Sequence, residues 1–298
     1  MSAPARPVTA GRARTPRPEP PGKARKTVGL LAGTAAVVAC VLLVEARWGR
    51  LVEAPPIVAD YLALMADGVL RHPLAEPTAT YWQRALDAML ESLYMAWIGT
   101  VIGAVLSFPL AFLAAANVAP RPVVFVTRQL LNLIRAVPEL IFAIAIMLPI
   151  FGFGPLAGAL ALGVGSVGTL GKLTSEVIEG IDPGPVEAAR SSGAGLLPTL
   201  RWSVVPQALP EAVAFWLYRF EINIRASAVL GVLGAGGIGS ILSRLFQQRE
   251  WERIGITLLA IIVVTVVIDQ ISARVRTRII RGPDGAAPPT PLVPLEDR

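Results

Sequence analysis

Residues 181–210 read IDPGPVEAARSSGAGLLPTLRWSVVPQALP, a stretch rich in proline and small residues between two long apolar runs. Either Asp182-Pro183 or Gly184-Pro185 offers an N-cap and a first-turn proline for a short helix. Gly193 can end this helix, because glycine adopts the positive φ of a helix C-cap without strain. A second short helix is predicted from Pro198 to Pro206, so the stretch forms two rigid pieces joined by a glycine elbow.

The same stretch is longer than a simple connection between two spans needs to be, and it carries many apolar side chains. These are Val186, Ala189, Leu196, Leu197, Leu200, Trp202 and Val204. Apolar residues on a loop that faces water usually mark a docking surface. The sequence therefore predicts that another protein binds this loop.

The composition predicts an all-α membrane protein. The 298 residues are 54% hydrophobic and 16% charged, and their mean hydropathy is +0.60, whereas soluble domains carry about 25% charged residues. The apolar residues gather in runs long enough for helices that cross a hydrocarbon layer of roughly 30 Å, which takes about 20 residues each.

These runs predict about six membrane-spanning helices. The predicted spans are 28–44, about 86–116, a third ending at 151, a fourth from 155 to about 181, and then about 208–232 and 254–272. Residues 1–27 are predicted to form a disordered basic cytoplasmic tail. Residues 45–83, which Pro55, Pro56, Pro73 and Pro77 are expected to break, are predicted to form an external connection with a short interfacial helix near 58–69. The last five spans and the loop at 181–208 form a core at 84–280, and a cytoplasmic tail follows at 281–298.

The formal charge of +6 predicts the orientation of the chain. Six crossings place both termini on one face, and the two ends are the most basic segments, so both termini and the 181–208 loop are predicted to be cytoplasmic. Arg121, Arg128 and Arg135 are predicted to mark a further inside loop. No nucleic-acid partner is expected, because the basic residues are not interleaved with aromatic ones.

The residues offer no catalytic pair, metal site or cofactor site. The single cysteine, Cys40, lies in an apolar run, and the single histidine, His72, stands alone. Residues 163–174, GVGSVGTLGKLT, match the dinucleotide pattern GxGxxG, but apolar helical residues precede them instead of a strand. Ser166 and Leu173 also stand where a P-loop needs Gly and Ser or Thr. These glycines are therefore predicted to pack helices closely in lipid, as are Gly99 and Gly103.

The loop resembles the EAA loop of the membrane-spanning subunits of ABC importers. The resemblance rests on Glu187, Ala188, Ala189, Gly193 and Pro206, with nine residues between the glycine and the four-residue segment that ends in this proline. Ser203, at the start of that segment, departs from the aliphatic residue usual in the family.

Four longer stretches resemble the permease subunit of the phosphonate ABC importer. They are LNLIRAVPEL from 131, GTLGKLTSEVIEGIDPGPVEAARSSGA from 168, LYRFEINIRASAVLGVLGAGGIG from 217 and IDQISARVRTR from 268. The resemblance covers about 86–278. It implies a type I, MetI-like permease fold in the cytoplasmic (inner) membrane, and a transport subunit that is not an enzyme.

The resemblance also implies the partners. They are a dimer of ATPase subunits beneath the EAA loop, a periplasmic or lipid-anchored phosphonate-binding protein, and a second permease subunit that is either the same chain or a paralogue. Phosphate, phosphite or another small anion remains an alternative substrate. Two other classes stay open: a membrane enzyme with Glu91, Glu139 or Glu221 as acid or base, and a surface protein lipidated at Cys40.

Charged residues inside spans are costly and mark functional candidates. Arg219, Glu221, Arg225 and Glu139 are candidates for the translocation pathway. Glu221 and Arg225 are four residues apart and are predicted to pair on one helix face, which would equally serve as a purely structural salt bridge. Gly234, Gly236 and Gly237 are predicted to form either an external gate or a close helix crossing.

Overall fold

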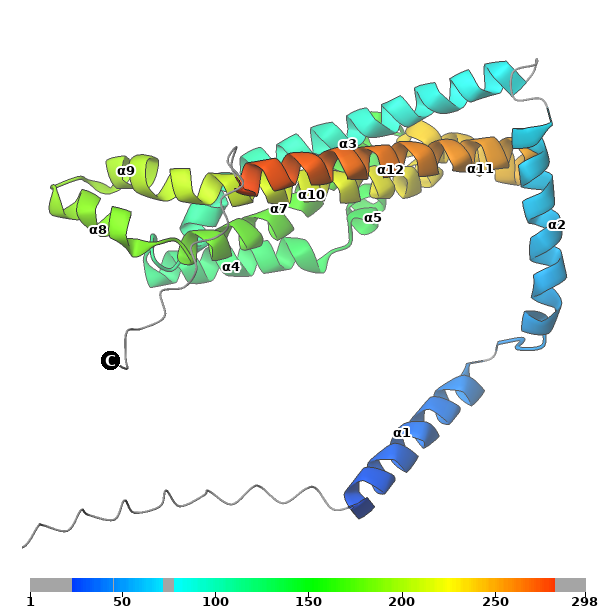
Figure 1. Ribbon diagram of the computed structural model, residues 1–298, viewed down its shortest axis with the longest axis horizontal. Helices are drawn as coiled ribbons and strands as arrows, with labels where there is room; N and C mark the ends of the chain where they lie inside the picture. The colour runs from blue at the N-terminus through cyan, green and yellow to red at the C-terminus, as the bar shows by residue number, and fades with distance from the viewer. Residues whose placement is uncertain (1–22, 45, 72–77, 282–298) are drawn as a thin grey trace, which may run out of the picture. The chain divides into compact units, whose positions relative to one another are not determined.

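The computed structural model describes residues 23–44, 46–71 and 78–281, and every regular element in these ranges is a helix (Figure 1). The chain divides into two units, residues 1–57 and 58–298, which are described separately. Residues 1–22, 45, 72–77 and 282–298 lie outside the described residues. The predictions for most of both tails, and for His72, fall there.

The first unit contains the helix α1, Lys23–Leu43, and the beginning of α2, Arg50–Leu70. The 18 residues Lys26–Leu43 have a mean hydropathy of 2.0, which suits the predicted first span. The helix begins at Lys23, inside the segment predicted to be a disordered tail.

The helix α2 corrects the prediction for the external connection. It is 21 residues long and includes Pro55 and Pro56, which were expected to break the chain. Both prolines lie in its second turn, so only the carbonyls of Leu51 and Val52 lose their helical donors. The predicted short interfacial helix at 58–69 is thus the second half of a longer one.

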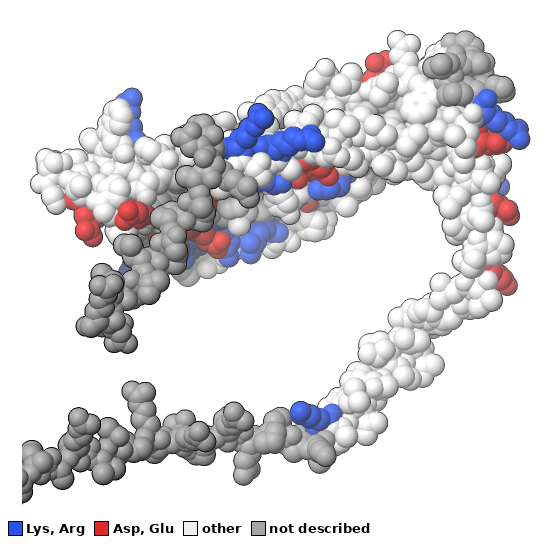
Figure 2. Space-filling view, in the orientation of Figure 1, with Lys and Arg blue, Asp and Glu red and all other residues white. Residues whose placement is uncertain are grey.

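In the second unit, four long helices form the bundle. They are α3, Thr78–Ala114; α7, Pro155–Glu179; α10, Val205–Leu230; and α12, Trp251–Arg281. The helix α3 starts at Thr78, so the last residues of the predicted external connection belong to it. Figure 2 shows wide uncharged areas along α3, as expected for surface that meets lipid.

The helices α3 and α7 form the most extensive helix pair of the bundle. Glycines allow this close approach: a Cβ on Gly99 would lie 2.7 Å from the Leu162 Cβ, and one on Gly163 would lie 2.8 Å from the Ile102 Cγ2. Residues 163–174 lie inside α7, not at a strand-to-helix turn. The predicted packing role of these glycines is confirmed.

A Gly99→Val substitution is therefore expected to destabilise the chain strongly. The new side chain has no room between α3 and α7, and overpacking typically costs about 1–3 kcal/mol. The melting temperature of the purified protein in detergent should fall by several degrees. Gly33→Val in α1 is the control, since a Cβ there meets nothing within 4 Å; equal melting temperatures for both variants would contradict the packing role.

Two spans are broken. The helix α4, Arg121–Ala136, meets the short helices α5, Glu139–Phe142, and α6, Leu148–Phe151, at a bend of 84°, with the π-turn η1, Ala143–Met147, between the short helices. The break falls at Val137, whose extended backbone is the conformation that a following proline favours. Residues 121–136 thus form a helix in place of the predicted loop.

The second broken span continues α10 through the π-turn η3, Gly231–Ala235, into α11, Gly237–Gln248, at a bend of 58°. In the described residues, four helices are long and apolar enough to cross a membrane, and the number rises to six if each bent pair counts as one span. The prediction of about six spans agrees with the upper number.

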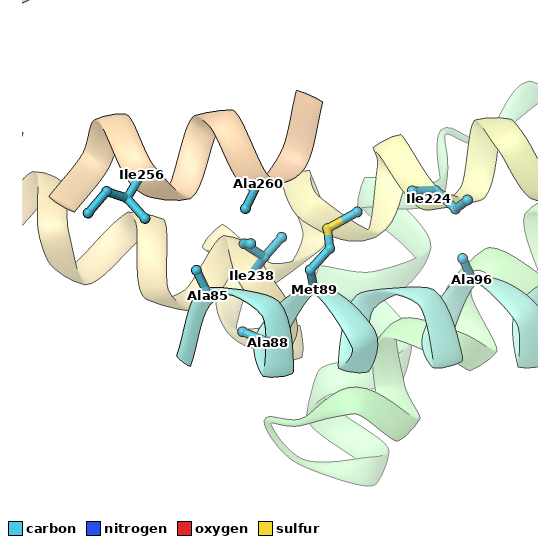
Figure 3. Close-up of a cluster of buried hydrophobic side chains, with 8 residues drawn as sticks. All are labelled: Ala85, Ala88, Met89, Ala96, Ile224, Ile238, Ile256 and Ala260. Atoms are coloured by element: carbon cyan, nitrogen blue, oxygen red, sulfur yellow. The ribbon is translucent and has the colours of Figure 1, made fainter. Parts of the chain in front are cut away.

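The hydrophobic core lies where α3, α10, α11 and α12 meet (Figure 3). Its buried members are Ala85, Ala88, Met89, Ala96, Ile224, Ile238, Ile256 and Ala260. Small alanines face larger methionine and isoleucine side chains, which lets the helices interlock at short range. This core fixes the bent α10–α11 pair against the straight helices.

Candidate functional site

The loop between α7 and α10 begins with the helix α8, Pro183–Ser191. The Asp182 carboxylate accepts a hydrogen bond from the Gly184 amide at 2.9 Å, so Asp182-Pro183 is the pair that starts the helix. Gly193 follows the helix with φ +83°. The sequence signals for both ends of α8 are confirmed.

The second piece of the loop differs from the prediction. The helix α9, Leu196–Thr199, begins two residues before Pro198 and continues through the π-turn η2, Leu200–Val204, directly into α10. Pro206 therefore lies inside a continuous helix. It follows the π-turn, where the regular hydrogen-bond ladder is already interrupted, so its missing N–H does not end the helix.

Hydrogen bonds hold α8 against this continuous helix. The Ser203 hydroxyl donates to the Pro185 carbonyl at 3.0 Å, and the Gln207 side-chain oxygen accepts from the Asp182 amide at 3.1 Å. This hydrogen bond explains why a serine can occupy position 203, where an aliphatic residue is usual in the family. Sequence reasoning missed Gln207, because its partner lies 25 residues away.

The loop forms most of a groove of about 350 Å³, whose lining is partly apolar and partly charged. Its lining includes Glu187, together with Val118, Val186, Leu196, Leu200 and Val204. Beside it, Leu197 and Trp202 are 77% and 72% exposed, and Glu187 and Ala188 are exposed on α8, with Ala189 half-buried. The predicted combination of a rigid loop and exposed apolar side chains is present.

A buried polar network joins four helices near the break after α4. Arg219 on α10 forms an ion pair with Glu139 on α5, and its Nε donates to the Ser166 hydroxyl on α7 at 2.9 Å. Asn223 donates to the Thr100 hydroxyl on α3 at 2.9 Å. The Arg219 side chain is 8% exposed, against 31% for Glu139, so this charge pair lies largely inside the protein.

The predicted pair of Glu221 with Arg225 does not form. Glu221 accepts from the Ser272 hydroxyl at 2.5 Å and lies 3.4 Å from the Arg276 guanidinium, whereas Arg225 lies 3.4 Å from an Asp269 oxygen. All three partners lie on α12. Glu221 and Arg225 therefore do not pair with each other, and each instead forms polar contacts that connect α10 to α12.

A double-mutant cycle can check this correction. Removing Arg225 and Asp269 together should cost less stability than the sum of the single losses, by about 0.2–1 kcal/mol, because the pair is half exposed. The Arg225→Gln and Glu221→Gln cycle is the matched control and should be additive. Thermal melts in detergent supply the values, and coupling only in the control would restore the sequence-based pair.

The glycines Gly234, Gly236 and Gly237 form the bend between α10 and α11. All three have positive φ, at +100°, +86° and +63°. A Cβ on Gly236 would lie 2.9 Å from Glu91 Oε1 on α3, and the Ile238 amide donates to the Ser92 hydroxyl at 3.0 Å. The bend lies close against α3, as a helix crossing requires, and its three positive φ values suit a hinge as well.

No group of three His, Cys, Asp or Glu side chains that could hold a metal ion occurs among the described residues. Besides Gln207, sequence reasoning missed Ser166, Asn223, Asp269 and Arg276. Each is polar and acts through a partner at least 44 residues away. Ser166 lies inside an apolar run and could have been marked by it, whereas Arg276 stands between Arg274 and Arg278 and carries no such signal.

Comparisons with known proteins give three similarities. A family model described as "binding-protein-dependent transport system inner membrane component" matches residues 107–281. The phosphite transport system permease protein PtxC of Stutzerimonas stutzeri is 38% identical over 82% of this chain and 88% of that protein. The phosphate-import permease protein PhnE of Mycolicibacterium smegmatis is 41% identical over 61% of this chain, which spans only 34% of that longer protein.

Among solved structures, an inward-facing conformation of the MetNI methionine ABC transporter matches with a TM-score of 0.60. The sequence identity is 21%, and the match covers 69% of this chain and 99% of the other. At a sequence identity of 21%, the match supports the fold and nothing beyond it. The predicted all-α, MetI-like permease fold is confirmed.

Proposed function

This chain belongs to the family of binding-protein-dependent transport system inner membrane components, and from that premise we propose that it is the permease subunit of an ATP-driven importer of phosphonates. As a family member it is a multi-pass ABC importer permease of the inner membrane and not itself an ATPase. The observation that carries the substrate class, small phosphorus oxyanions, is the similarity to permeases named for phosphite and phosphate import. The choice of phosphonate within this class rests on the resemblance of the stretches from 131, 168, 217 and 268 to the phosphonate permease. Phosphite and phosphate are the alternative substrates.

The proposal assigns coupling to the α8 loop. An ATPase subunit binds the exposed face of α8 through Glu187, Ala188 and Ala189, and the elbow at Gly193 lets the short helix follow the motion of that subunit. Because α9 and η2 continue into α10, the motion passes to the span through Pro206. The loop and both termini then lie in the cytoplasm.

The proposal places the translocation pathway beside Glu139 and Arg219, where the break after α4 brings a charge pair into the bundle. An arginine at such a place offsets the negative charge of a tetrahedral oxyanion. Glu221 and Arg225 are proposed as supporting residues that tie α10 to α12. Gly234, Gly236 and Gly237 are proposed as an external gate, since their positive φ values give a hinge that other residues adopt only with strain.

The remaining partners follow from the family. A second permease subunit, identical or paralogous, completes the pathway, and an external binding protein, periplasmic or lipid-anchored, delivers the anion. Membrane lipid surrounds the spans, and no cofactor is proposed.

Reconstitution tests this function. The chain is assembled in proteoliposomes with an ATPase subunit and a phosphonate-binding protein from the same source, and ATP-driven uptake of labelled 2-aminoethylphosphonate is measured against phosphite and phosphate. Preferred uptake of the phosphonate is expected. Preference for phosphite or phosphate would replace the substrate, and turnover of a substrate by the purified chain alone would favour a membrane enzyme.

A further inference from the structure

The helix α4 carries a row of polar side chains, Arg121, Arg128, Asn132 and Arg135, which we call the α4 stripe. An α-helix has 3.6 residues per turn, so residues seven apart lie on nearly the same face, and Asn132 falls beside them. All four residues are exposed. The sequence had assigned these arginines only to an inside loop.

The other side of α4 is apolar and equally open. Val126, Leu130 and Leu133 are 64%, 45% and 66% exposed, whereas Val124, Thr127 and Leu131 are buried against the bundle. The helix thus presents one apolar side that suits lipid or a partner protein, and one cationic side that does not. The apolar side can therefore face lipid or a partner protein, whereas the cationic side needs water or counter-ions.

The depth of the stripe can be measured along α7. A Cβ on Gly168, at the middle of the 25-residue helix α7, would lie 2.9 Å from the Arg135 amide nitrogen. At the C-terminal end of α7, the Arg128 side chain forms an ion pair with Glu179 and donates a hydrogen bond to the Ala114 carbonyl at 2.9 Å. The stripe therefore runs from the end of a membrane span to its middle.

A charged side chain at mid-span must face water or a counter-ion, because hydrocarbon solvates it poorly. Arg128 has Glu179, and Lys172 lies 3.8 Å from Glu176 one turn along α7. These four residues and Asn132 line one pocket of about 130 Å³, in which each cation has a carboxylate. Within the described residues, Arg121 and Arg135 form no salt bridge of this kind. Because Arg135 lies at the middle of the span, the water that solvates it has to reach that depth.

We propose that the α4 stripe lines the inner half of the pathway and binds tetrahedral phosphorus oxyanions on their way to the cytoplasm, a proposal that rests on the proposed import function. Arg135 receives the anion next to the Glu139–Arg219 pair, and Arg128 and Arg121 offer successive weaker contacts. Weak, repeated sites suit a route, since an anion must leave each site as readily as it enters.

Single-cysteine labelling tests the stripe. Replacing the only native cysteine by Cys40→Ser gives a clean background, into which Asn132→Cys is introduced, with Leu133→Cys and Val126→Cys as controls on the apolar side of the same helix. Inside-out vesicles with the assembled importer are treated with anionic and cationic thiosulfonate reagents. Only a thiolate in water reacts, so Asn132→Cys should react at least about tenfold faster than either control.

The charge of the stripe gives a second readout. The anionic reagent should outrun the cationic one at position 132 by about tenfold, because nearby cations raise the local anion concentration, and Arg135→Gln should shrink this ratio. Equal rates at 132 and 133, or no anion preference, would overturn the proposal. These rates do not depend on which anion is imported, so they separate the stripe from the proposed function.

Protection distinguishes the two sources of a phosphorus oxyanion. Methylphosphonate or inorganic phosphate should slow labelling at 132 in vesicles of phosphatidylcholine alone. Protection that requires phosphatidylglycerol and ignores the free anions would mean that the stripe binds lipid headgroups, which contradicts a route for substrate. Arg274→Gln, an exposed arginine on α12, is the control substitution and should leave the rates unchanged.

Discussion

ATP-driven uptake is expected to fall by about 10–100-fold when Glu187 is replaced by lysine, because losing a charge-assisted contact costs about 1.5–3 kcal/mol. Glu187 is exposed on α8 beside the groove of the loop, so the substitution removes little from the fold. Uptake and ATP hydrolysis are measured on the same proteoliposomes. Asp60→Lys, an exposed acid on α2, is the charge-matched control.

The elbow offers a sharper version of the same test. Gly193 has φ +83°, which a β-branched residue adopts only with strain, whereas Gly195 has the extended backbone, φ −69° and ψ 179°, that valine favours. A Cβ meets nothing within 4 Å at either position. Gly193→Val should therefore uncouple ATP hydrolysis from uptake and Gly195→Val should not. Coupling through this loop would be refuted if the Gly193→Val variant and the Glu187→Lys variant were each inserted normally and each showed full uptake.

Replacing Arg219 by glutamine is expected to give the largest loss of stability among the substitutions described. Arg219→Gln leaves Glu139 without its partner inside the bundle, and removing one member of a buried ion pair costs about 3–5 kcal/mol, with the lower end appropriate because Glu139 is partly exposed. Less assembled complex should be recovered, with a melting temperature lowered by several degrees. Arg274→Gln serves as the control.

A double variant separates structure from transport at this pair. Glu139→Gln with Arg219→Gln leaves two neutral amides that can hydrogen-bond, so assembly should largely return. Uptake should stay low, because the buried cation at this point of the proposed pathway is lost even though the arginines of α4 remain. Recovery of uptake together with assembly would show that the pair only stabilises the fold, and would remove Arg219 from the pathway.

Local signals in the sequence were reliable where the structure depends on neighbouring residues. The cap at Asp182, the end at Gly193 and the close packing at Gly99 all follow from the residue itself or from its own turn of helix. The apolar runs likewise predicted the spans, because only length and hydropathy decide whether a helix can cross a bilayer.

Prediction failed where distant residues decide. Spacing alone favoured Glu221 with Arg225, yet α12 supplies Asp269 and Arg276 as the actual partners. The prolines of α2 were overvalued as breakers because their position in the second turn was unknown before the helix start at Arg50 was known. The bend after α4 depends on packing against α7 as well as on Pro138, and a single sequence does not contain that contact.

The unbroken run of helix from Leu196 to Leu230 has a mechanical consequence. Its 35 residues make a rod of roughly 50 Å, held at Arg219 by contacts to α5 and α7. About two thirds of the rod lies on the loop side of that point. In the proposed coupling, a tilt of the rod about Arg219 would move the loop end about twice as far as the glycine end, so a large displacement at the ATPase would become a smaller one at the far end.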